Sequence, residues 1–489
     1  MIRPPSRPPS SPALRTLGRP RLFGTDGVRA PFGVPPLDRA TVTALARALA
    51  AALAESGPAL EPAAGRQSEP APEAGPLVVL GGDTRESTPE ICRWLASGLA
   101  AGGARYRDAG VLPTPGIARL ARDLGAAGGI SVSASHNPYP DNGIKLIDGG
   151  GFKWSAAAEL ALEERLARGP AAGAAVDLAL PELAADPALA ERYLDELAAT
   201  LPAGRPLAGF RVVLDAGNGA ASPLAEPLFS RLGAEVELLA AAPDGRNVND
   251  GCGSTAPETM AARVRAIGAD LGAAFDGDAD RAIVADERGQ VRDGDALLYL
   301  WATHLAGQGR LDPPAIVATS MSNLGLERAL ERHGIALVRC DVGDRAVVET
   351  MRAQGIVLGG EQSGHLVHLG LSTTGDGLLS ALQMAGFVAA TGRPLSELLE
   401  GFRRYPQILL NVRVKEKPDL LSLPKVAAAA RAVEDRLGAD GRLVLRYSGT
   451  EPLARVMIEG PDQQTVESLA GDLAGAIADE IGARGSGSV

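Results

Sequence analysis

One polar turn of this sequence presents a hydroxyl group that could act on a substrate. Ser135 and His136 lie in this turn, which follows the apolar run Gly-Gly-Ile-Ser-Val. Asn-Pro and Asn-Gly dipeptides typically mark such turns, so the loop would hold the hydroxyl at the mouth of a sheet. A serine hydrolase is disfavoured, because no Gly-x-Ser-x-Gly elbow surrounds Ser135 and because the adjacent His136 is badly placed as its base. A Ser-rich turn without a chemical role is the alternative.

Lys145 follows this turn within the run Asp-Asn-Gly-Ile-Lys. The chain has five lysines and 43 arginines, so it uses arginine wherever a permanent cation is enough. An amine can lose and regain a proton, which a guanidinium group cannot do at neutral pH. We therefore expect Lys145 to exchange protons, although Lys153 lies nearby and has no such claim.

A second loop carries three carboxylates on alternate residues, at Asp276, Asp278 and Asp280. Three such groups can converge on one hard divalent cation. A calcium EF-hand is the rival interpretation, because Glu287 falls at the twelfth loop position. However, Arg281 stands at the sixth position, where the sharp turn requires glycine, and the flanking sequences resemble strands rather than helices. An exposed acidic turn is the other alternative. We favour Mg²⁺, which takes few protein carboxylates and leaves room for phosphate oxygens.

Three further loops combine glycine with polar or charged side chains. They are Phe23–Arg29, Gly360–His365 and Arg446–Pro452, the last with Arg455 close behind. Arginine forks, hydroxyls and exposed backbone N–H groups in the last loop are suited to binding an anion. Nucleotide binding is poorly supported, because the chain has no Gly-Lys dipeptide for a P-loop and because residues 217–222 miss the dinucleotide fingerprint.

The elements that must position these loops follow a repeated design. Residues 77–85, 211–220 and 315–323 each read as a buried strand that leads through a polar loop into a helix. We expect three similar mixed α/β domains and, after Tyr405-Pro406, a smaller α+β module. Residues Pro58–Pro76 would form an exposed insertion. The expected division is a disordered extension 1–20, α/β domains 21–170, 189–292 and 293–405, and a C-terminal domain 406–489.

Composition narrows the class of protein. The chain has 489 residues, 45% of them hydrophobic and 22% charged, and its net charge of −11 comes without a basic block, so we expect no nucleic-acid partner. No apolar run approaches the length of about 18 residues that spans a bilayer, so we expect no membrane association. The three cysteines are far apart and form no disulfide or metal motif, which favours a reducing cytoplasm.

Taken in order, these loops resemble those of the α-D-phosphohexomutase superfamily. The similar segments are FGTDGVR, SASHNP with DNGIK, DGDADR, GEQSGH and RYSGTEP, and they cover the chain from Arg21 to about residue 485. Within the superfamily, residues 247–255, 360–365 and 372–377 are most similar to the bacterial phosphoglucosamine mutases. The resemblance implies that the four domains surround a central cleft, and it implies an isomerase that interconverts glucosamine 6-phosphate and glucosamine 1-phosphate. A phosphoglucomutase or phosphomannomutase, and a non-catalytic regulator that binds sugar phosphates, are the alternatives.

The resemblance also implies a role for each motif residue. Ser135 would carry the transferable phosphoryl group as phosphoserine, and a phosphate oxygen on it would join Asp276, Asp278 and Asp280 in holding one Mg²⁺. The general acid/base would be Lys145. Charge or proton movement would be supported by Arg29, His136, Arg281 and His365. Sugar hydroxyls would contact Glu361 and Ser363, and the phosphate that is not transferred would contact Arg446, Ser448, Gly449, Thr450 and Arg455.

Three further expectations concern the whole protein. The partner would be a small-molecule amino-sugar phosphate, and a homodimer is compatible with the sequence. Because a surface-loop hydroxyl contributes little to stability, we expect the fold to tolerate Ser135→Ala.

Overall fold

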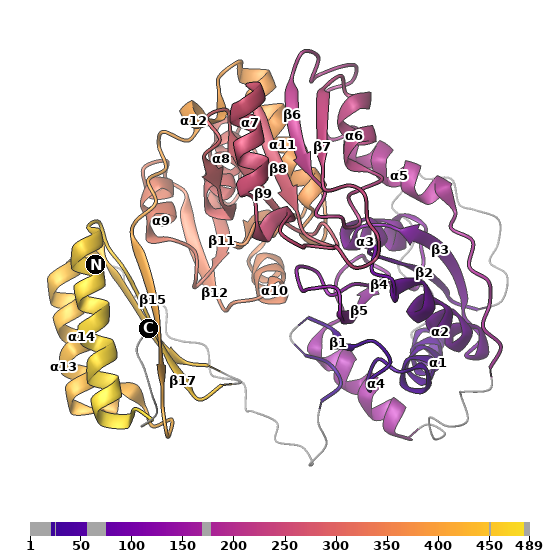
Figure 1. The fold of residues 1–489 in the computed structure, drawn as a ribbon, viewed down its shortest axis with the longest axis horizontal. Coiled ribbons are helices and arrows are strands. Elements are labelled where there is room, and N and C mark those ends of the chain that lie inside the picture. Colours follow the sequence, from indigo (N-terminus) through magenta and orange to yellow (C-terminus); the bar gives the residue numbers. More distant parts are fainter. Residues whose placement is uncertain (1–20, 25, 56–74, 169–177, 449–450, 484–489) are drawn as a thin grey trace.

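Four β-sheets organise the chain. The computed structural model describes residues 21–24, 26–55, 75–168, 178–448 and 451–483 (Figure 1). The expected extension 1–20, most of the expected insertion, and Gly449 and Thr450 lie outside these residues. The first three sheets are mixed and covered by helices, and the fourth is a smaller antiparallel sheet. The predicted fold class is therefore confirmed.

The first sheet has the strand order β1-β5-β4-β2-β3. Its strand β2 pairs in parallel with both β3 and β4, whereas β5 pairs antiparallel with β4 and with β1. Its elements are β1 (Val28–Pro31), α1 (Arg39–Glu55), β2 (Leu77–Gly82), α2 (Thr88–Ala101), β3 (Arg105–Val111), α3 (Thr114–Asp123), β4 (Gly128–Val132), β5 (Asp141–Asp148) and α4 (Ala156–Arg168).

The second sheet repeats this plan in the order β10-β9-β8-β6-β7. Strands β7, β6 and β8 run parallel, and β9 turns back antiparallel to β8. Its elements are α5 (Pro187–Ala198), β6 (Arg211–Asp215), α6 (Ala225–Arg231), β7 (Glu235–Leu239), α7 (Glu258–Ile267), β8 (Leu271–Phe275), β9 (Ala282–Asp286) and β10 (Val291–Arg292). The predicted strands on both sides of the acidic loop are confirmed.

The third sheet has the order β12-β11-β13-β14, and in it only the edge strand β14 pairs antiparallel with its neighbour. Its elements are α8 (Gly294–Gly307), β11 (Ala315–Thr319), α9 (Leu324–Glu331), β12 (Ala336–Cys340), α10 (Asp344–Gln354), β13 (Leu358–Gly360), β14 (Leu366–His368), α11 (Gly377–Thr391) and α12 (Leu395–Leu398). Helix α11 also contacts β8 and β9 of the second sheet. One hydrophobic core runs from Val79 to Leu399 and joins parts of the first three domains.

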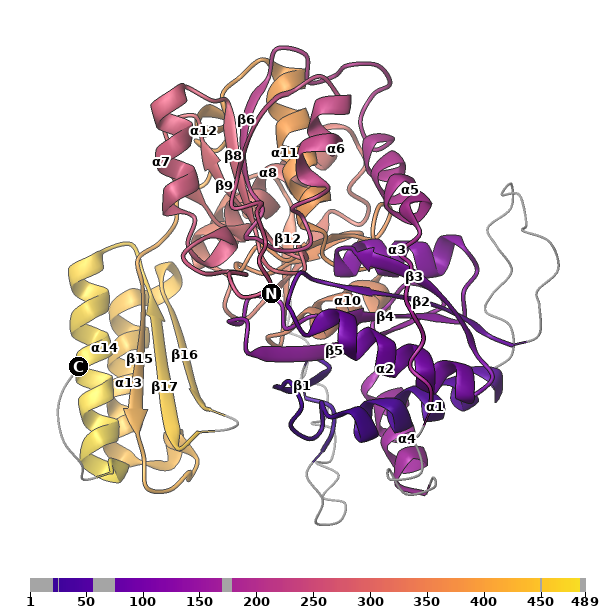
Figure 2. The ribbon, with the colours of Figure 1, turned by 45° about the vertical axis from the view of Figure 1, so that its right-hand side comes forward.

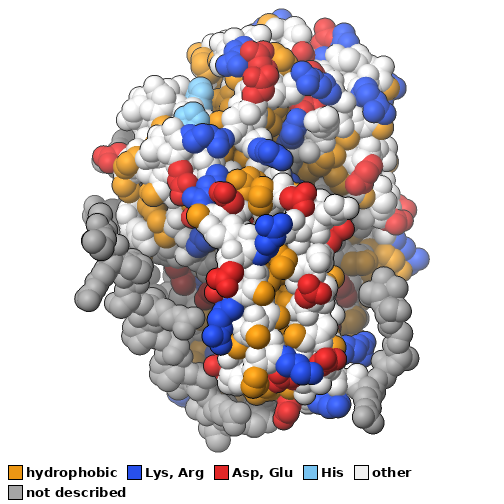
Figure 3. Space-filling view, turned by 90° about the vertical axis from the view of Figure 1, so that its left-hand side faces the viewer, with side chains coloured by type: hydrophobic (Ala, Val, Ile, Leu, Met, Phe, Trp, Pro, Cys, Tyr) orange, Lys and Arg blue, Asp and Glu red, His pale blue; other side chains and the backbone are white. Residues whose placement is uncertain are grey.

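The fourth sheet is antiparallel in the order β15-β17-β16. Its elements are β15 (Gln407–Arg413), α13 (Pro424–Leu437), β16 (Arg442–Tyr447), β17 (Leu453–Glu459) and α14 (Gln463–Ile481). Both helices lie on the outer side of the sheet (Figure 1), and this module has a hydrophobic core of its own. On its outer face, basic and acidic side chains are interspersed (Figure 3).

A buried carboxylate joins the C-terminal module to the third domain. Glu459 at the end of β17 is fully buried and accepts hydrogen bonds from Asn323 Nδ2 (3.1 Å) and from the backbone N–H of Leu324 (3.3 Å). It also forms an ion pair with Arg442, at 2.6 Å. Because anions are stabilised at helix N-termini, this side chain ties the module to the start of α9.

The four sheets share one feature that determines where polar loops fall. In each of the first three sheets, a hairpin loop connects the last parallel strand to the antiparallel strand, and these are the β4–β5, β8–β9 and β13–β14 loops. The β16–β17 loop of the fourth sheet is likewise a hairpin. Four of the loops that the sequence singles out for chemistry are these four hairpin loops.

Among the described helices, none combines the length and hydropathy needed to cross a bilayer.

Candidate active site

The β4–β5 loop holds Ser135 in an unusual conformation. Its backbone φ is 52°, in the left-handed region that few non-glycine residues adopt. Its backbone N–H donates to Ser133 Oγ at 2.9 Å. The residue is only 1% exposed. Our expectation of a surface-loop hydroxyl at position 135 is therefore wrong, because neighbouring domains enclose the loop.

Arg85, which follows β2, holds the backbone of this loop in place. Its side chain is fully buried and pairs with Asp83 at 2.9 Å. Its two terminal nitrogens donate to four backbone carbonyl oxygens of the loop, those of Ser135, Asn137, Pro138 and Asp141. A guanidinium group has five N–H donors in a fixed plane, so it can hold several carbonyls in one geometry. Sequence reasoning missed Arg85, although its run Gly-Gly-Asp-Thr-Arg after a strand was a usable signal.

Asn249 from the second domain holds the same loop from the other side. Its side-chain amide donates to the carbonyl of Ser135 at 2.9 Å and to that of Asn137 at 3.3 Å. In the sequence, residues 247–255 around Asn249 indicate the subfamily but not a role for this side chain. The structure thus gives Asn249 a contact that spans two domains.

The acidic β8–β9 loop lies directly against the serine loop. The Ser135 hydroxyl donates to Asp276 Oδ2 at 2.5 Å. Gly277 is required for this approach, since a Cβ atom there would lie 2.6 Å from the Ser135 carbonyl oxygen. The two loops that the sequence singled out first are therefore in direct contact.

The three aspartates form a buried cluster that fits a hard divalent cation. Asp276, Asp278 and Asp280 are each no more than 3% exposed, and one oxygen from each lies within 4.8 Å of the others. The Oδ1 atoms of Asp278 and Asp280 are buried and accept no hydrogen bond. Burial and the two neighbouring carboxylates raise the pKa of Asp276 to about 8. A cation bound here would satisfy the free oxygens and relieve the repulsion.

Lys145 on β5 lies beside the same cluster. Its Nζ is 2.7 Å from Asp278 Oδ2, 3.2 Å from Asp280 Oδ2 and 3.4 Å from Asp26 Oδ2. Burial alone would lower the pKa of Lys145, but these three carboxylates outweigh it and raise the pKa well above its usual value. In this state the side chain is an ammonium that offsets part of the cluster's negative charge.

The β13–β14 loop brings a third set of side chains to the aspartates. His365 is buried, and its Nε2 accepts a hydrogen bond from the backbone N–H of Gly375 at 3.0 Å. Its other ring nitrogen, Nδ1, lies 3.6 Å from Asp280 Oδ1. In the same loop Glu361 accepts from the backbone N–H of Gly343 at 3.1 Å, and Ser363 Oγ is buried without a hydrogen-bond partner. A free hydroxyl of this kind is available to a ligand.

Three other predicted residues border the serine and acidic loops. His136 Nδ1 lies 3.5 Å from Ser135 Oγ, and burial, then Arg281, lowers the pKa of His136. The backbone N–H of Arg281 donates to Asp276 Oδ1 at 3.2 Å, and its side-chain Nε lies 3.8 Å from Asp280. Arg29 forms an ion pair with Asp26 at 2.6 Å. Arg281 therefore contacts the cluster directly, His136 reaches it through Ser135, and Arg29 reaches it through Asp26 and Lys145.

The predicted phosphate-binding residues lie on the C-terminal module. Arg446 and Arg455 are directly opposite each other on β16 and β17. Ser448 Oγ accepts from the backbone N–H of Glu451 at 3.3 Å and from the Arg455 guanidinium at 3.4 Å. Like charges in opposition are unfavourable unless an anion lies between them. This module lies beside the third domain and apart from the first in both ribbon views (Figures 1 and 2), so these residues are not gathered with the other three loops.

Comparison with known proteins defines the class to which this architecture belongs. Four domain families, all described as phosphoglucomutase/phosphomannomutase, match the chain: α/β/α domain I at residues 20–172, domain II at 191–289, domain III at 293–405 and the C-terminal domain at 409–476. The chain belongs to the phosphoglucomutase/phosphomannomutase family.

Its relatives within this family carry a more particular name. The phosphoglucosamine mutase of Solibacter usitatus is 45% identical over 464 residues, which cover 94% of this chain and 99% of that protein. The phosphoglucosamine mutase of Moorella thermoacetica is 45% identical and covers 92% of this chain and 97% of its own. The resemblance seen in the motifs is thereby confirmed.

Solved structures have the same fold. A phosphoglucomutase/phosphomannomutase family protein from Burkholderia thailandensis has a TM-score of 0.73 at 24% identity, and the match covers 94% of this chain and 97% of that chain. An N-acetylphosphoglucosamine mutase of Aspergillus fumigatus, solved with GlcNAc-6P and magnesium, has a TM-score of 0.61 at 18% identity. This match covers 94% of the present chain and 95% of the Aspergillus chain.

Replacement of the loop-organising arginine tests this account of the site. Arg85→Met would remove the cation that pairs with buried Asp83 and one donor from each of four loop carbonyls, so we expect the free energy of unfolding to fall by about 3 kcal/mol. Turnover of the folded fraction should fall by about a hundredfold, because the serine is displaced. Thermal unfolding and steady-state rates measure the two effects. Arg168→Met, at an exposed arginine of α4, is the matched control. Wild-type activity in Arg85→Met would contradict the assigned role.

Proposed function

We propose that this chain is a phosphoglucosamine mutase. It interconverts glucosamine 6-phosphate and glucosamine 1-phosphate through a phosphorylated Ser135 and a sugar 1,6-bisphosphate intermediate. The observation that carries the proposal is the contact between the Ser135 hydroxyl and Asp276, within a buried cluster of three aspartates and beside Lys145. The names of relatives at 45% identity over nearly the whole chain support the choice of substrate.

Asp276, Asp278 and Asp280, together with a phosphate oxygen on Ser135, would hold one Mg²⁺. Hard carboxylate oxygens are the ligands that this ion prefers, and the Oδ1 atoms of Asp278 and Asp280, which accept no hydrogen bond, support the assignment. When bound, the ion would stabilise charge on the transferred phosphoryl group and offset the charge of the aspartates.

The transfer itself exchanges one phosphorus–oxygen bond for another. The bond between phosphorus and Ser135 Oγ breaks, while a bond forms to O1 or O6 of the sugar phosphate. Lys145, an ammonium beside the aspartates, would give a proton to the leaving Ser135 Oγ and take up the proton of the attacking sugar hydroxyl in its place. In the second half of the reaction it would give that proton to the leaving sugar oxygen and take up the proton of the Ser135 hydroxyl. Arg281 and His136 add positive charge or hydrogen bonds near the serine. Arg29 does the same near Lys145, and His365 does so near Asp280.

The bisphosphate must turn end for end between the two transfers, so the enzyme needs a second anion site. Arg446, Ser448 and Arg455 would hold the phosphate that is not transferred, with Gly449 and Thr450 in the same loop. Glu361 and Ser363 would contact the sugar hydroxyls, and the free Ser363 Oγ supports this role. Because the C-terminal module has its own core, it can close over the site as a unit.

A substrate panel tests the proposed specificity. We expect kcat/KM for glucosamine 6-phosphate to exceed that for glucose 6-phosphate and mannose 6-phosphate, each assayed with Mg²⁺ and a trace of the matching 1,6-bisphosphate. Equal or better use of the mannose compound would make the chain a phosphomannomutase instead. Failure to turn over all three would favour a non-catalytic sugar-phosphate-binding protein.

The phosphoserine has its own test. Ser135→Ala should lower turnover by at least about a thousandfold, because no group remains to carry the phosphoryl between the two half-reactions. Intact mass should show one phosphoryl group on the wild type that phosphatase removes, and none on the variant. The exposed Ser230→Ala is the control. Near-normal activity in Ser135→Ala would remove the phosphoenzyme mechanism.

The metal assignment predicts a change in Mg²⁺ dependence. Asp278→Asn removes one charged oxygen ligand, so the Mg²⁺ concentration for half-maximal activity should rise by about tenfold or more. Isothermal titration with Mg²⁺ should show the same weakening without substrate. Asp435→Asn, at an exposed position of α13, should leave both readings unchanged. Identical Mg²⁺ affinity in Asp278→Asn and the wild type would refute this ligand set.

A further inference from the structure

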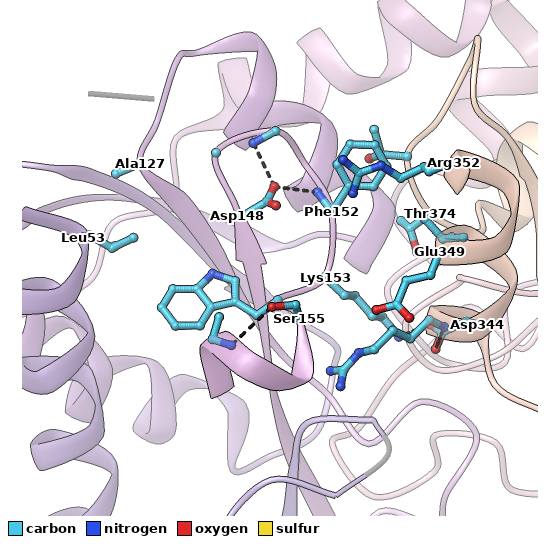
Figure 4. Close-up of a pocket in the computed structure, with 17 residues that line it drawn as sticks. Leu53, Ala127, Asp148, Phe152, Lys153, Ser155, Asp344, Glu349, Arg352 and Thr374 are labelled. Carbon is cyan, nitrogen blue, oxygen red and sulfur yellow. Dashed lines mark hydrogen bonds and ion pairs between the residues drawn. The ribbon is translucent and has the colours of Figure 1, made fainter. Parts of the chain in front are cut away.

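Lys153, for which the sequence indicates no chemical role, bridges two domains. It lies after β5 in the first domain, and its Nζ is 2.6 Å from Asp26 Oδ1 in the N-terminal loop. The same ammonium pairs with Asp344, the first residue of α10 in the third domain. Figure 4 shows Lys153 and Asp344 meeting from the first and third domains at the side of a cavity.

Each of the two aspartates also reaches a residue of the candidate active site. Asp26 Oδ2 is 3.4 Å from Lys145 Nζ, and Asp344 Oδ2 is 3.8 Å from His365 Nε2. Lys145 and His365 in turn converge on Asp280, at 3.2 and 3.6 Å. These contacts form a ring through three domains, in the order Lys145, Asp26, Lys153, Asp344, His365 and Asp280. The link between Asp344 and His365 is a proximity at 3.8 Å and not a hydrogen bond, because His365 Nε2 already accepts from Gly375.

The bridge at Lys153 is shielded from solvent. The side chains of Lys153 and Asp344 are 13% and 14% exposed. Burial would lower the pKa of Lys153, but Asp26 and Asp344 outweigh it and raise the pKa above its usual value, so the ammonium persists at neutral pH. Attraction between Lys153 and Asp344 is therefore stronger than between charges on the surface, and removal of Lys153 leaves the buried Asp344 carboxylate without its ammonium partner.

A cavity of about 450 Å³ lies beside the bridge, between the start of α10 and the segment after β5 (Figure 4). Other contacts across the same boundary are polar or cation–π: Arg345 pairs with Glu159 at 2.6 Å, Thr373 donates to the Gly151 carbonyl at 2.5 Å, and the Arg352 guanidinium lies 4.3 Å from the centre of the Phe152 ring. The position of α10 against the first domain therefore depends on charged and hydrogen-bonded contacts.

We propose that Lys153 is a positioning residue for the mutase reaction, which holds Asp26 against Lys145 and Asp344 against His365. The proposal rests on the proposed function, because it concerns the residues assigned there to proton and charge movement. Among the described residues, the ion partners of Lys153 are Asp26 and Asp344 and not the three aspartates of the cluster. It acts by aligning the two site residues across the boundary between the first and third domains.

The test compares Lys153→Met with Lys153→Arg. Loss of the ammonium should lower kcat by about ten- to hundredfold and leave KM within about twofold, because alignment rather than substrate binding is lost. Lys153→Arg keeps the charge and should recover most of kcat. Lys425→Met, which removes an exposed lysine paired with Asp479, is the matched control and should behave as the wild type. Wild-type kcat in Lys153→Met, or no recovery in Lys153→Arg, would overturn the proposal.

A double variant separates positioning from simple loss of stability. Lys153→Met and Asp344→Asn break the same bridge, so the double variant should lose no more kcat than the worse single variant. If the loss of kcat in the double variant equals the product of the two single losses, the two residues act independently, and the proposed coupling through the ring is wrong. Kinetics are compared at a temperature where thermal unfolding shows every variant to be fully folded.

A measurement without substrate distinguishes failure of this inference from failure of the proposed function. Amide hydrogen exchange in α10 should become faster in Lys153→Met than in the wild type, because the start of the helix loses its tie to the first domain. Unchanged exchange would overturn the bridge as a tie, whatever sugar phosphate the enzyme uses. Absence of mutase turnover in the wild type would instead remove the proposed function and leave the exchange result standing.

Discussion

Three carboxylates crowded into a buried loop are the constraint on which the rest of this structure depends. Burial and, after it, repulsion from the other two carboxylates raise the pKa of Asp276 to about 8, and two oxygens of the cluster have no hydrogen-bond partner. The protein offsets this cost with Lys145 and with the hydroxyl of Ser135, both of which come from another domain. The arrangement is stable only while three domains hold fixed positions, and it leaves a place for a divalent cation.

Repetition of one topological element explains how the chain gathers these groups. In three successive sheets the polar loop follows the last parallel strand and leads into an antiparallel partner. Packing the three sheets around a shared core therefore brings a hydroxyl loop, an acidic loop and a Glu-Ser-His loop to one place. The fourth sheet carries its arginine hairpin on a module with a separate core. That separation suits a part that moves against the other three.

Contacts between distant segments turn these loops into a site. Arg85 and Ser135 are 50 residues apart, Asn249 and Ser135 are 114 apart, and Lys153 and Asp344 are 191 apart. None of these pairs leaves a periodic or spaced pattern in the sequence. They also explain why Ser135 is buried and why its left-handed backbone is tolerated, because the loop carbonyls around it are held by side chains of two domains.

The amino-acid sequence alone determined the strands, the class of fold and the chemistry of each loop. These depend on hydrophobic periodicity, on turn residues and on the spacing of Asp276, Asp278 and Asp280, all of which are local properties of the chain. Tertiary structure decided that Ser135 is buried, that Arg85 and Asn249 hold its loop, and that Lys153 links two domains. Burial and electrostatic pairing are properties of a residue's surroundings in space, and those surroundings exist only once the domains have packed together.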